Sequence, residues 1–229
     1  MASGRAYFRR ALELNPRWSA AHIYYGLFLA AAYRPHEAAA HVKLALDLDP
    51  LSPLVHALAG LVMHLARAYP EAERLARRAL DLQPDYLFAL VRLAAVLTSG
   101  GRPAEAIPVA ERTVGLSRAP NFLGLLGAVY GLAGRRDDLT HLEHELEERR
   151  SRGEYITPVS RVAFAMGRGD GAMIRRALED CLADHTPFVS LRIICGPSLD
   201  AWRTDVGLDE LLLRLGDGVR PSNPMNTGA

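Results

Sequence analysis

A short pattern of an acidic residue, leucine, a polar residue and proline occurs three times in this chain at equal distances. The copies end at Pro16, Pro50 and Pro84, and since 50 minus 16 and 84 minus 50 agree, the period is 34 residues. Proline ends a helix because it lacks an amide donor and disfavours helical geometry in the residue before it. A fixed period of about 20–50 residues indicates supersecondary units stacked in a row. The chain is therefore expected to fold as a solenoid.

Small residues recur in the same register as the prolines. They form one column at Gly26, Gly60 and Ala94, a second at Gly4, Ala38, Ala72 and Ala106, and a third at Ala11, Ala45 and Ala79. Two antiparallel helices approach closely only where neither carries a bulky side chain at the crossing. Between the columns, apolar residues follow helical spacing without the two-residue alternation of strands. These columns predict an all-α fold of helix pairs.

The period, the small columns and the terminal proline resemble the tetratricopeptide repeat. The resemblance implies a right-handed α-solenoid of antiparallel helix pairs with a C-terminal capping helix. It divides the chain into the second helix of an incomplete N-terminal repeat (1–18), four units (19–52, 53–86, 87–119 and 120–153), a fifth helix pair (154–186), a cap (187–216) and a disordered tail (217–229). In the fourth unit, Leu139 and Leu146 stand where small residues are usual.

The two ends of the repeat array depart from the pattern. The helix within 1–18 lacks the first helix that would cover its inward face, including Phe8 and Leu12. Such an exposed face is expected to recruit an upstream domain, a second copy of the chain or a partner protein. Near the other end, Asp205 is expected to cap a last helix whose leucines cover the final pair. Those leucines are Leu208, Leu211, Leu212 and Leu215.

A closer resemblance covers nearly the whole chain. The order of units, the connection from Arg149 to Tyr155 and the ending from Asp200 to Asp205 are similar to the C-terminal repeat module of bacterial signalling proteins. That module follows a serine/threonine kinase, a winged-helix regulator or a cyclase domain, none of which is present here. Val206 replaces the proline that is usual after the last aspartate, which predicts a different detail in the cap.

In tetratricopeptide proteins the first helix of each pair lines a concave groove, and the resemblance assigns ten residues to it. They are Ile23, Tyr24, Leu27, Leu54, Leu58, Leu61, His64, Phe88, Val91 and Arg92. The lysine and asparagine with which some relatives clamp a C-terminal carboxylate are absent. A mainly apolar groove favours an amphipathic helix or an extended apolar segment as ligand. We therefore expect a protein–protein interaction scaffold or regulatory adaptor.

Composition excludes several other classes of protein. The formal net charge of +1, from 27 basic and 26 acidic residues, argues against nucleic acid or an anionic membrane as partner. No segment has the apolar length of a membrane span or of a secretion signal, so a cytoplasmic location is expected. The two cysteines, Cys181 and Cys195, make neither a disulfide framework nor a zinc site and are expected to serve packing.

Catalytic and metal motifs are also missing from the sequence. His141 and His144 lie three residues apart, with His185 later in the chain, but no third ligand stands at a recognisable spacing. His22 and His56 occupy equivalent positions and are expected to be packing residues. The sequence contains no nucleophile motif and no phosphate-binding loop. It also lacks the pair of base-contacting residues that recurs in each unit of an RNA-binding helical repeat. We expect no enzyme activity, no cofactor and no metal.

Two alternatives stay open at this point. The concave surface could close into a pocket for a small apolar ligand, or even shelter a reaction. The N-terminal half-repeat could instead mediate self-association.

Overall fold

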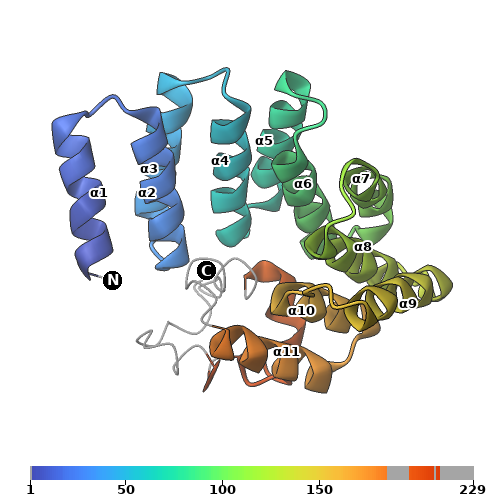
Figure 1. Cartoon of the computed structure of the whole chain (residues 1–229). Coiled ribbons are helices and arrows are strands. Elements are labelled where there is room, and N and C mark those ends of the chain that lie inside the picture. Colours follow the sequence, from blue (N-terminus) through green and yellow to red (C-terminus); the bar gives the residue numbers. More distant parts are fainter. Residues whose placement is uncertain (1, 185–195, 209, 212–229) are drawn as a thin grey trace, which may run out of the picture.

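The computed structural model describes residues 2–184, 196–208 and 210–211, and all of its regular structure is helical in that part of the chain. The elements are α1 (Ala2–Leu14), α2 (Ser19–Ala31), α3 (Pro35–Leu48), α4 (Pro53–Leu65), α5 (Tyr69–Leu82), α6 (Leu87–Ser99), α7 (Pro103–Leu116), α8 (Pro120–Leu132), α9 (Arg136–Ser151), α10 (Pro158–Arg168), α11 (Gly171–Ala183) and the 3-10 helix η1 (Pro197–Trp202). Figure 1 shows α1 to α6 as a row of antiparallel helices that turns at α7 and α8, so that α10 and α11 lie below the row. The predicted all-α solenoid is confirmed.

The small columns bring the two helices of each pair into close contact. Ala38, Ala45, Ala72 and Ala79 are completely buried. A Cβ atom added at Gly60 would lie 3.1 Å from the carbonyl oxygen of Ala72, which is closer than nearly all real contacts. The close approach predicted from the columns is therefore present in these pairs, and it leaves no room for larger side chains at the crossing.

Each turn between paired helices contains one residue with left-handed backbone geometry. Gly101 and Gly134 hold this position with φ of 77° and 81°, whereas Tyr33 and Arg67 hold it with φ of 59° and 61°. Glycine adopts this conformation readily, but a side chain makes it cost about 1–2 kcal/mol. The turns after α2 and α4 are thus strained where the later turns are relaxed.

Two equivalent histidines support the repeat from inside. The Nε2 atoms of His22 and His56 lie 2.9 Å from the carbonyl oxygens of Pro16 and Pro50, respectively. Both histidines are buried. They tie each first helix to the proline that ends the preceding helix, so the expectation that they are packing residues is confirmed.

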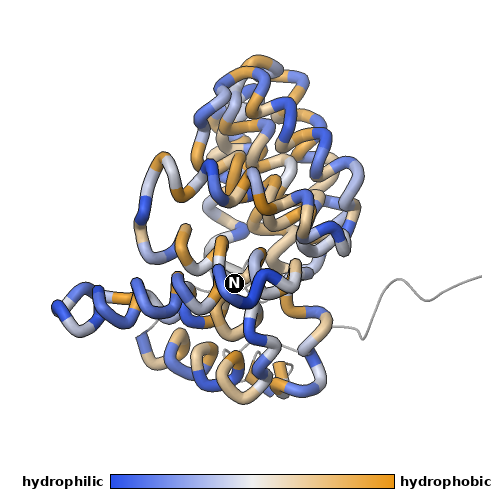
Figure 2. Tube along the Cα trace, turned by 90° about the vertical axis from the view of Figure 1, so that its right-hand side faces the viewer, coloured by the Kyte–Doolittle hydropathy of each residue, from blue (hydrophilic) through white to orange (hydrophobic). Residues whose placement is uncertain are grey.

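The fourth unit departs from the regular pairing. α8 packs most closely against α10, because its glycines face that helix: a Cβ at Gly127 would overlap the Phe164 ring, and one at Gly131 would overlap the backbone of Gly167. α9 instead carries Leu139 and Leu146 in its interface, both buried. These bulky side chains hold α9 farther away than a small residue would. Figure 2 shows the mainly hydrophilic α9 reaching out from the body.

The C-terminal residues pack on the last helix pair. Leu199, Val206, Leu208 and Leu211 are buried in one cluster with residues of α10 and α11, including Cys181. Helical geometry resumes only at Leu208, after Gly207 with a φ of 60°. Asp205 does not immediately precede this helix, so the N-cap role predicted for Asp205 is wrong, whereas Leu208 and Leu211 do cover the last helix pair as predicted. Leu212, Leu215, Cys195, His185 and the predicted disordered tail lie outside the described residues.

The glycine contact between α8 and α10 predicts a strong effect of one methyl group. Gly131→Ala places a Cβ against the backbone of Gly167 and is expected to lower the free energy of unfolding by about 1–3 kcal/mol. Gly115→Ala in α7 is the control, since a Cβ there meets nothing within 4 Å. It should stabilise the helix by up to about 1 kcal/mol. Urea unfolding measures both, and equal midpoints for the two variants would contradict this packing.

Candidate protein-binding groove

Five of the ten predicted groove residues are buried inside the stack. Ile23, Leu27, Leu58, Leu61 and His64 are each between 0% and 8% exposed. Ile23, Leu27, Leu58 and Leu61 belong to one core cluster, because neighbouring first helices pack directly against each other, α2 against α4 and α4 against α6. These side chains stabilise the stacking of the units and offer no surface to a partner in this structure.

The other five predicted residues keep accessible surface. Tyr24 is 44% and Leu54 37% exposed, and Phe88, Val91 and Arg92 are half-buried. We call Tyr24, Leu54, Tyr86 and Phe88 the aromatic patch; the Tyr86 and Phe88 ring centroids are 6.3 Å apart.

The aromatic patch spans three successive first helices. Burial, and then the neighbouring Tyr24, raise the pKa of Tyr86. Tyr24 in α2 therefore lies within electrostatic range of Tyr86, the residue before α6. The tetratricopeptide resemblance assigns Tyr24, Leu54 and Phe88 to the groove, so we expect the patch to lie on the concave face.

Arg92 lies one helical turn beyond Phe88 on α6. Its guanidinium carbon is 5.3 Å from the centroid of the Phe88 ring, a cation–π arrangement. Its Nε atom is buried without a hydrogen-bond partner. Burial lowers the pKa of Arg92 to about 10, so the side chain is still a cation at neutral pH.

His64 is buried near Arg92 but carries no charge at neutral pH. Burial lowers its pKa to about 3, with the cations Arg92 and Arg67 contributing in the same direction. The His64 Nε2 atom lies 2.9 Å from the Ser99 hydroxyl. Ser99 in turn is 3.2 Å from the hydroxyl of Ser198 in the C-terminal segment. His64 therefore links the first helices to that segment and is not a free acid or base.

The C-terminal segment closes one end of the concave face through an ion pair. Arg67, in the turn after α4, donates from Nε and Nη2 to the two carboxylate oxygens of Asp200 in η1, each at 2.8 Å. We call this pair the clasp; it joins residues 133 positions apart. The clasp was not predicted from the sequence. One signal was available, since Arg67 stands at the turn position where later units have glycine.

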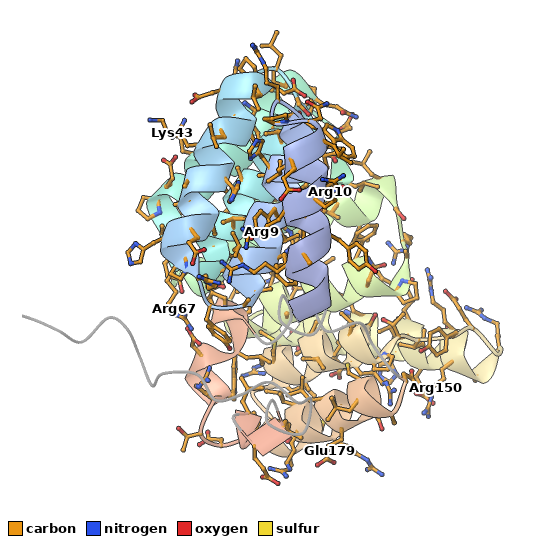
Figure 3. All side chains as sticks on the ribbon, turned by 90° about the vertical axis from the view of Figure 1, so that its left-hand side faces the viewer. Arg9, Arg10, Lys43, Arg67, Arg150 and Glu179 are labelled. Carbon is orange, nitrogen blue, oxygen red and sulfur yellow. The ribbon has the colours of Figure 1, made fainter. Side chains whose placement is uncertain are left out.

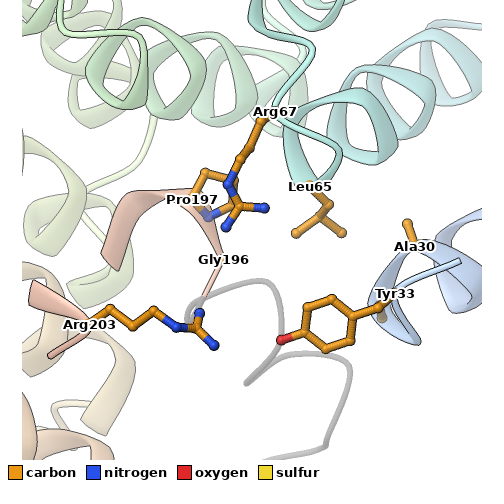
Figure 4. A pocket seen from close by; sticks show the side chains of 8 residues that line it. Ala30, Tyr33, Leu65, Arg67, Gly196, Pro197 and Arg203 are labelled. Carbon is orange, nitrogen blue, oxygen red and sulfur yellow. The ribbon is translucent and has the colours of Figure 1, made fainter. Parts of the chain in front are cut away.

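A small hollow lies beside the clasp. Tyr33, Leu65, Arg67, Pro197 and Arg203 contribute to its lining, as Figure 4 shows. Its volume of about 20 Å³ is room for roughly one water molecule. Pockets for small-molecule ligands measure about 300–1,000 Å³. The hollow gives no support to the small-ligand alternative.

Neither a metal centre nor a membrane segment emerges from the part of the chain that the structure describes. His141 and His144 lie on α9, and the described residues contain no group of three or more side chains able to hold a metal ion. Within the same residues, every helix is too short or too polar to cross a bilayer.

The clasp predicts different outcomes for two substitutions at one position. Arg67→Ala loses the ion pair and keeps the strained turn, so it is expected to cost about 1 kcal/mol of unfolding free energy, as is Asp200→Ala. Arg67→Gly loses the same pair but relieves about 1 kcal/mol of backbone strain. Its stability should therefore lie near the wild-type value. Chemical denaturation measures the unfolding free energies. If Arg67→Gly were no more stable than Arg67→Ala, the proposed backbone strain at position 67 would be contradicted.

No family model and no curated protein matches the chain, but solved structures do. MamA superposes with a TM-score of 0.55 at 21% identity, over 66% of this chain and 90% of MamA. PilW, described as a type IV pilus biogenesis factor, gives 0.58 at 16% identity over 81% and 87% of the two chains. Pseudomonas aeruginosa pilF gives 0.56 at 17% identity over 80% and 84%. Identities this low establish the fold alone, an α-solenoid of helix pairs, whose 34-residue register resembles the tetratricopeptide repeat.

Proposed function

We propose that this protein is an interaction scaffold that binds a helical or extended segment of a partner protein on its concave face. The observation that carries the proposal is the aromatic patch, where Tyr24 and Leu54 remain accessible beside half-buried Phe88. Aromatic side chains are common anchors of protein interfaces because they bury a large area with few rotatable bonds. The fold supports the same conclusion, since a curved row of helices presents one continuous surface.

The placement of the patch suggests how a partner would lie. Leu54 and Phe88 are the second residues of α4 and α6, whereas Ser99, which contacts the C-terminal segment, is the last residue of α6. The patch and the clasp are therefore at opposite ends of the first helices. A bound segment would contact the patch end, because η1 already occupies the other.

The finer expectations from the sequence belong to the same proposal. We infer a cytoplasmic regulatory adaptor without catalytic activity, in keeping with the resemblance to the repeat module of bacterial signalling proteins. The near-zero net charge favours protein over nucleic acid or an anionic membrane as partner. Small-ligand binding is the weaker alternative, given the size of the hollow beside the clasp.

A pair of surface substitutions tests the groove. Tyr24→Asp places a charge in the aromatic patch, and Leu44→Asp places one on α3 at nearly the same exposure, 46% against 44%. Short peptides selected from a displayed random library on the wild-type protein should lose at least about 10-fold in affinity for Tyr24→Asp. They should bind Leu44→Asp normally, as fluorescence anisotropy would measure. Peptides that bind both variants equally would remove the patch from the proposal. Leu61 is unsuitable for this test because it is 1% exposed.

We also propose self-association through α1, on a separate observation. Phe8 and Leu12, which were predicted to lie on the uncovered face, instead pack against the core that includes Tyr25, with the Phe8 and Tyr25 ring centroids 5.3 Å apart. The uncovered face carries Tyr7 and Leu14, which are 77% and 70% exposed, together with Ala11. Ala11 is half-buried, whereas the equivalent Ala45 and Ala79 are completely buried beneath the first helix of their own pairs. The face of α1 therefore has the shape that a first helix covers elsewhere in the chain. Figure 1 shows α1 at the end of the helix row, and Figure 3 shows it facing the viewer, with Arg9 and Arg10 labelled.

Sedimentation velocity over a range of concentrations tests this second proposal. The wild-type chain is expected to form dimers, and Tyr7→Glu to shift it to monomers, because the substitution places a charge within the apolar face. Leu116→Glu, at a site 45% exposed on α7, is the control and should associate like the wild type. A wild-type chain that stays monomeric at the highest concentration would contradict self-association.

A further inference from the structure

Arg92 is a half-buried cation that no carboxylate of the described residues neutralises. Its Nε atom is buried and has no hydrogen-bond partner among the described residues. Burial lowers the pKa of Arg92, and no carboxylate of the same residues contributes to the shift. Half-buried arginines such as Arg5 and Arg149 pair with carboxylates, whereas arginines without a carboxylate partner, such as Arg78 and Arg176, are exposed to solvent. Arg67 binds Asp200 through two hydrogen bonds, and Arg102 binds both Glu73 and Glu105. Arg92 is thus an exception within its own fold.

An unpaired buried charge destabilises the protein that carries it. Transfer of a cation from water to an apolar site is unfavourable unless an opposite charge compensates it. The Phe88 ring offers a cation–π contact at 5.3 Å, which compensates only in part. The neighbouring His64 contributes no negative charge, since it is neutral at physiological pH. The favourable partner for Arg92 must therefore come from outside the described residues.

The surroundings of Arg92 indicate the chemistry of that partner. A carboxylate matches the planar guanidinium and brings one negative charge to one positive charge. A phosphate would bring nearly two charges to this single cation, and the excess would be left in apolar surroundings. Val91 and the aromatic patch flank the site and favour apolar residues on either side of the acid.

We propose that the segment bound on the concave face carries an aspartate or glutamate between apolar residues, and that its carboxylate pairs with the Arg92 guanidinium. This inference rests on the proposed function and specifies the partner that the groove accepts. The charge lies one turn from Phe88 and the apolar contacts lie on the patch, so one short segment reaches both.

The probes for this proposal are peptides selected from the displayed random library and then synthesised with either an acidic residue or its amide. Selected peptides should be enriched in aspartate or glutamate. Replacing that residue by its amide should weaken binding to the wild-type protein by roughly 10- to 100-fold, the worth of a hydrogen bond to a charged group. For Arg92→Met, the acidic and amide peptides should bind equally weakly. Isothermal titration calorimetry measures all four combinations.

The melting temperature of Arg92→Met separates a loss of binding from a loss of folding. Methionine fills a similar apolar volume without the buried charge, so the variant is expected to melt at the wild-type temperature or about 2–4 °C higher. A melting temperature well below that of the wild type would show that Arg92 serves the fold, which overturns the proposal. Dimers lost in Arg92→Met would also overturn it, since a second copy would then be the occupant.

The outcomes distinguish this inference from the proposed function. Peptides that bind through Tyr24 without enrichment in acidic residues would overturn the acidic preference and leave the scaffold intact. Peptides that ignore both Tyr24→Asp and Arg92→Met would overturn both.

Discussion

The closeness of paired helices is the constraint on which the rest of this structure depends. Alanine at the crossing positions is completely buried, and at Gly60 a single added carbon would press against the backbone of the facing helix. Because interiors are packed as densely as organic crystals, each pair has one distance and one angle at which it fits. Repetition of that geometry every 34 residues produces a regular stack, and the stack produces an inner face made from first helices alone.

The fourth unit departs from the regular pairing, and the chain turns back on itself there. In the fourth unit the glycines of α8 face α10, and the leucines of α9 keep that helix at a greater distance. The chain turns there, and the C-terminal segment returns to the second unit, where Asp200 meets Arg67. The strained turns at Tyr33 and Arg67 occur on this returning side, and both residues line the hollow beside η1. Strain of this kind persists where other contacts hold the backbone in place.

The inner face consequently has two ends with different properties. One is closed by the clasp and by the hydrogen bonds that join His64, Ser99 and Ser198. The other carries aromatic rings and a cation that no carboxylate of the described residues neutralises. In the proposed scaffold, the apolar area would supply affinity and the charge of Arg92 would supply selectivity.

The period of the prolines and the small columns determined the helix pairs and their order, because those features act between residues close in sequence. The resemblance to the tetratricopeptide repeat assigned Tyr24, Leu54, Phe88, Val91 and Arg92 to a surface, and these five side chains remain partly accessible. What the sequence could not determine is which apolar positions are open, since Ile23, Leu27, Leu58 and Leu61 carry the same kind of side chain but are covered by the neighbouring first helices. Contacts between segments distant in sequence also determine the clasp and the position of α9. They leave Arg92 without a carboxylate among the described residues. The curvature of the stack sets which of these segments meet.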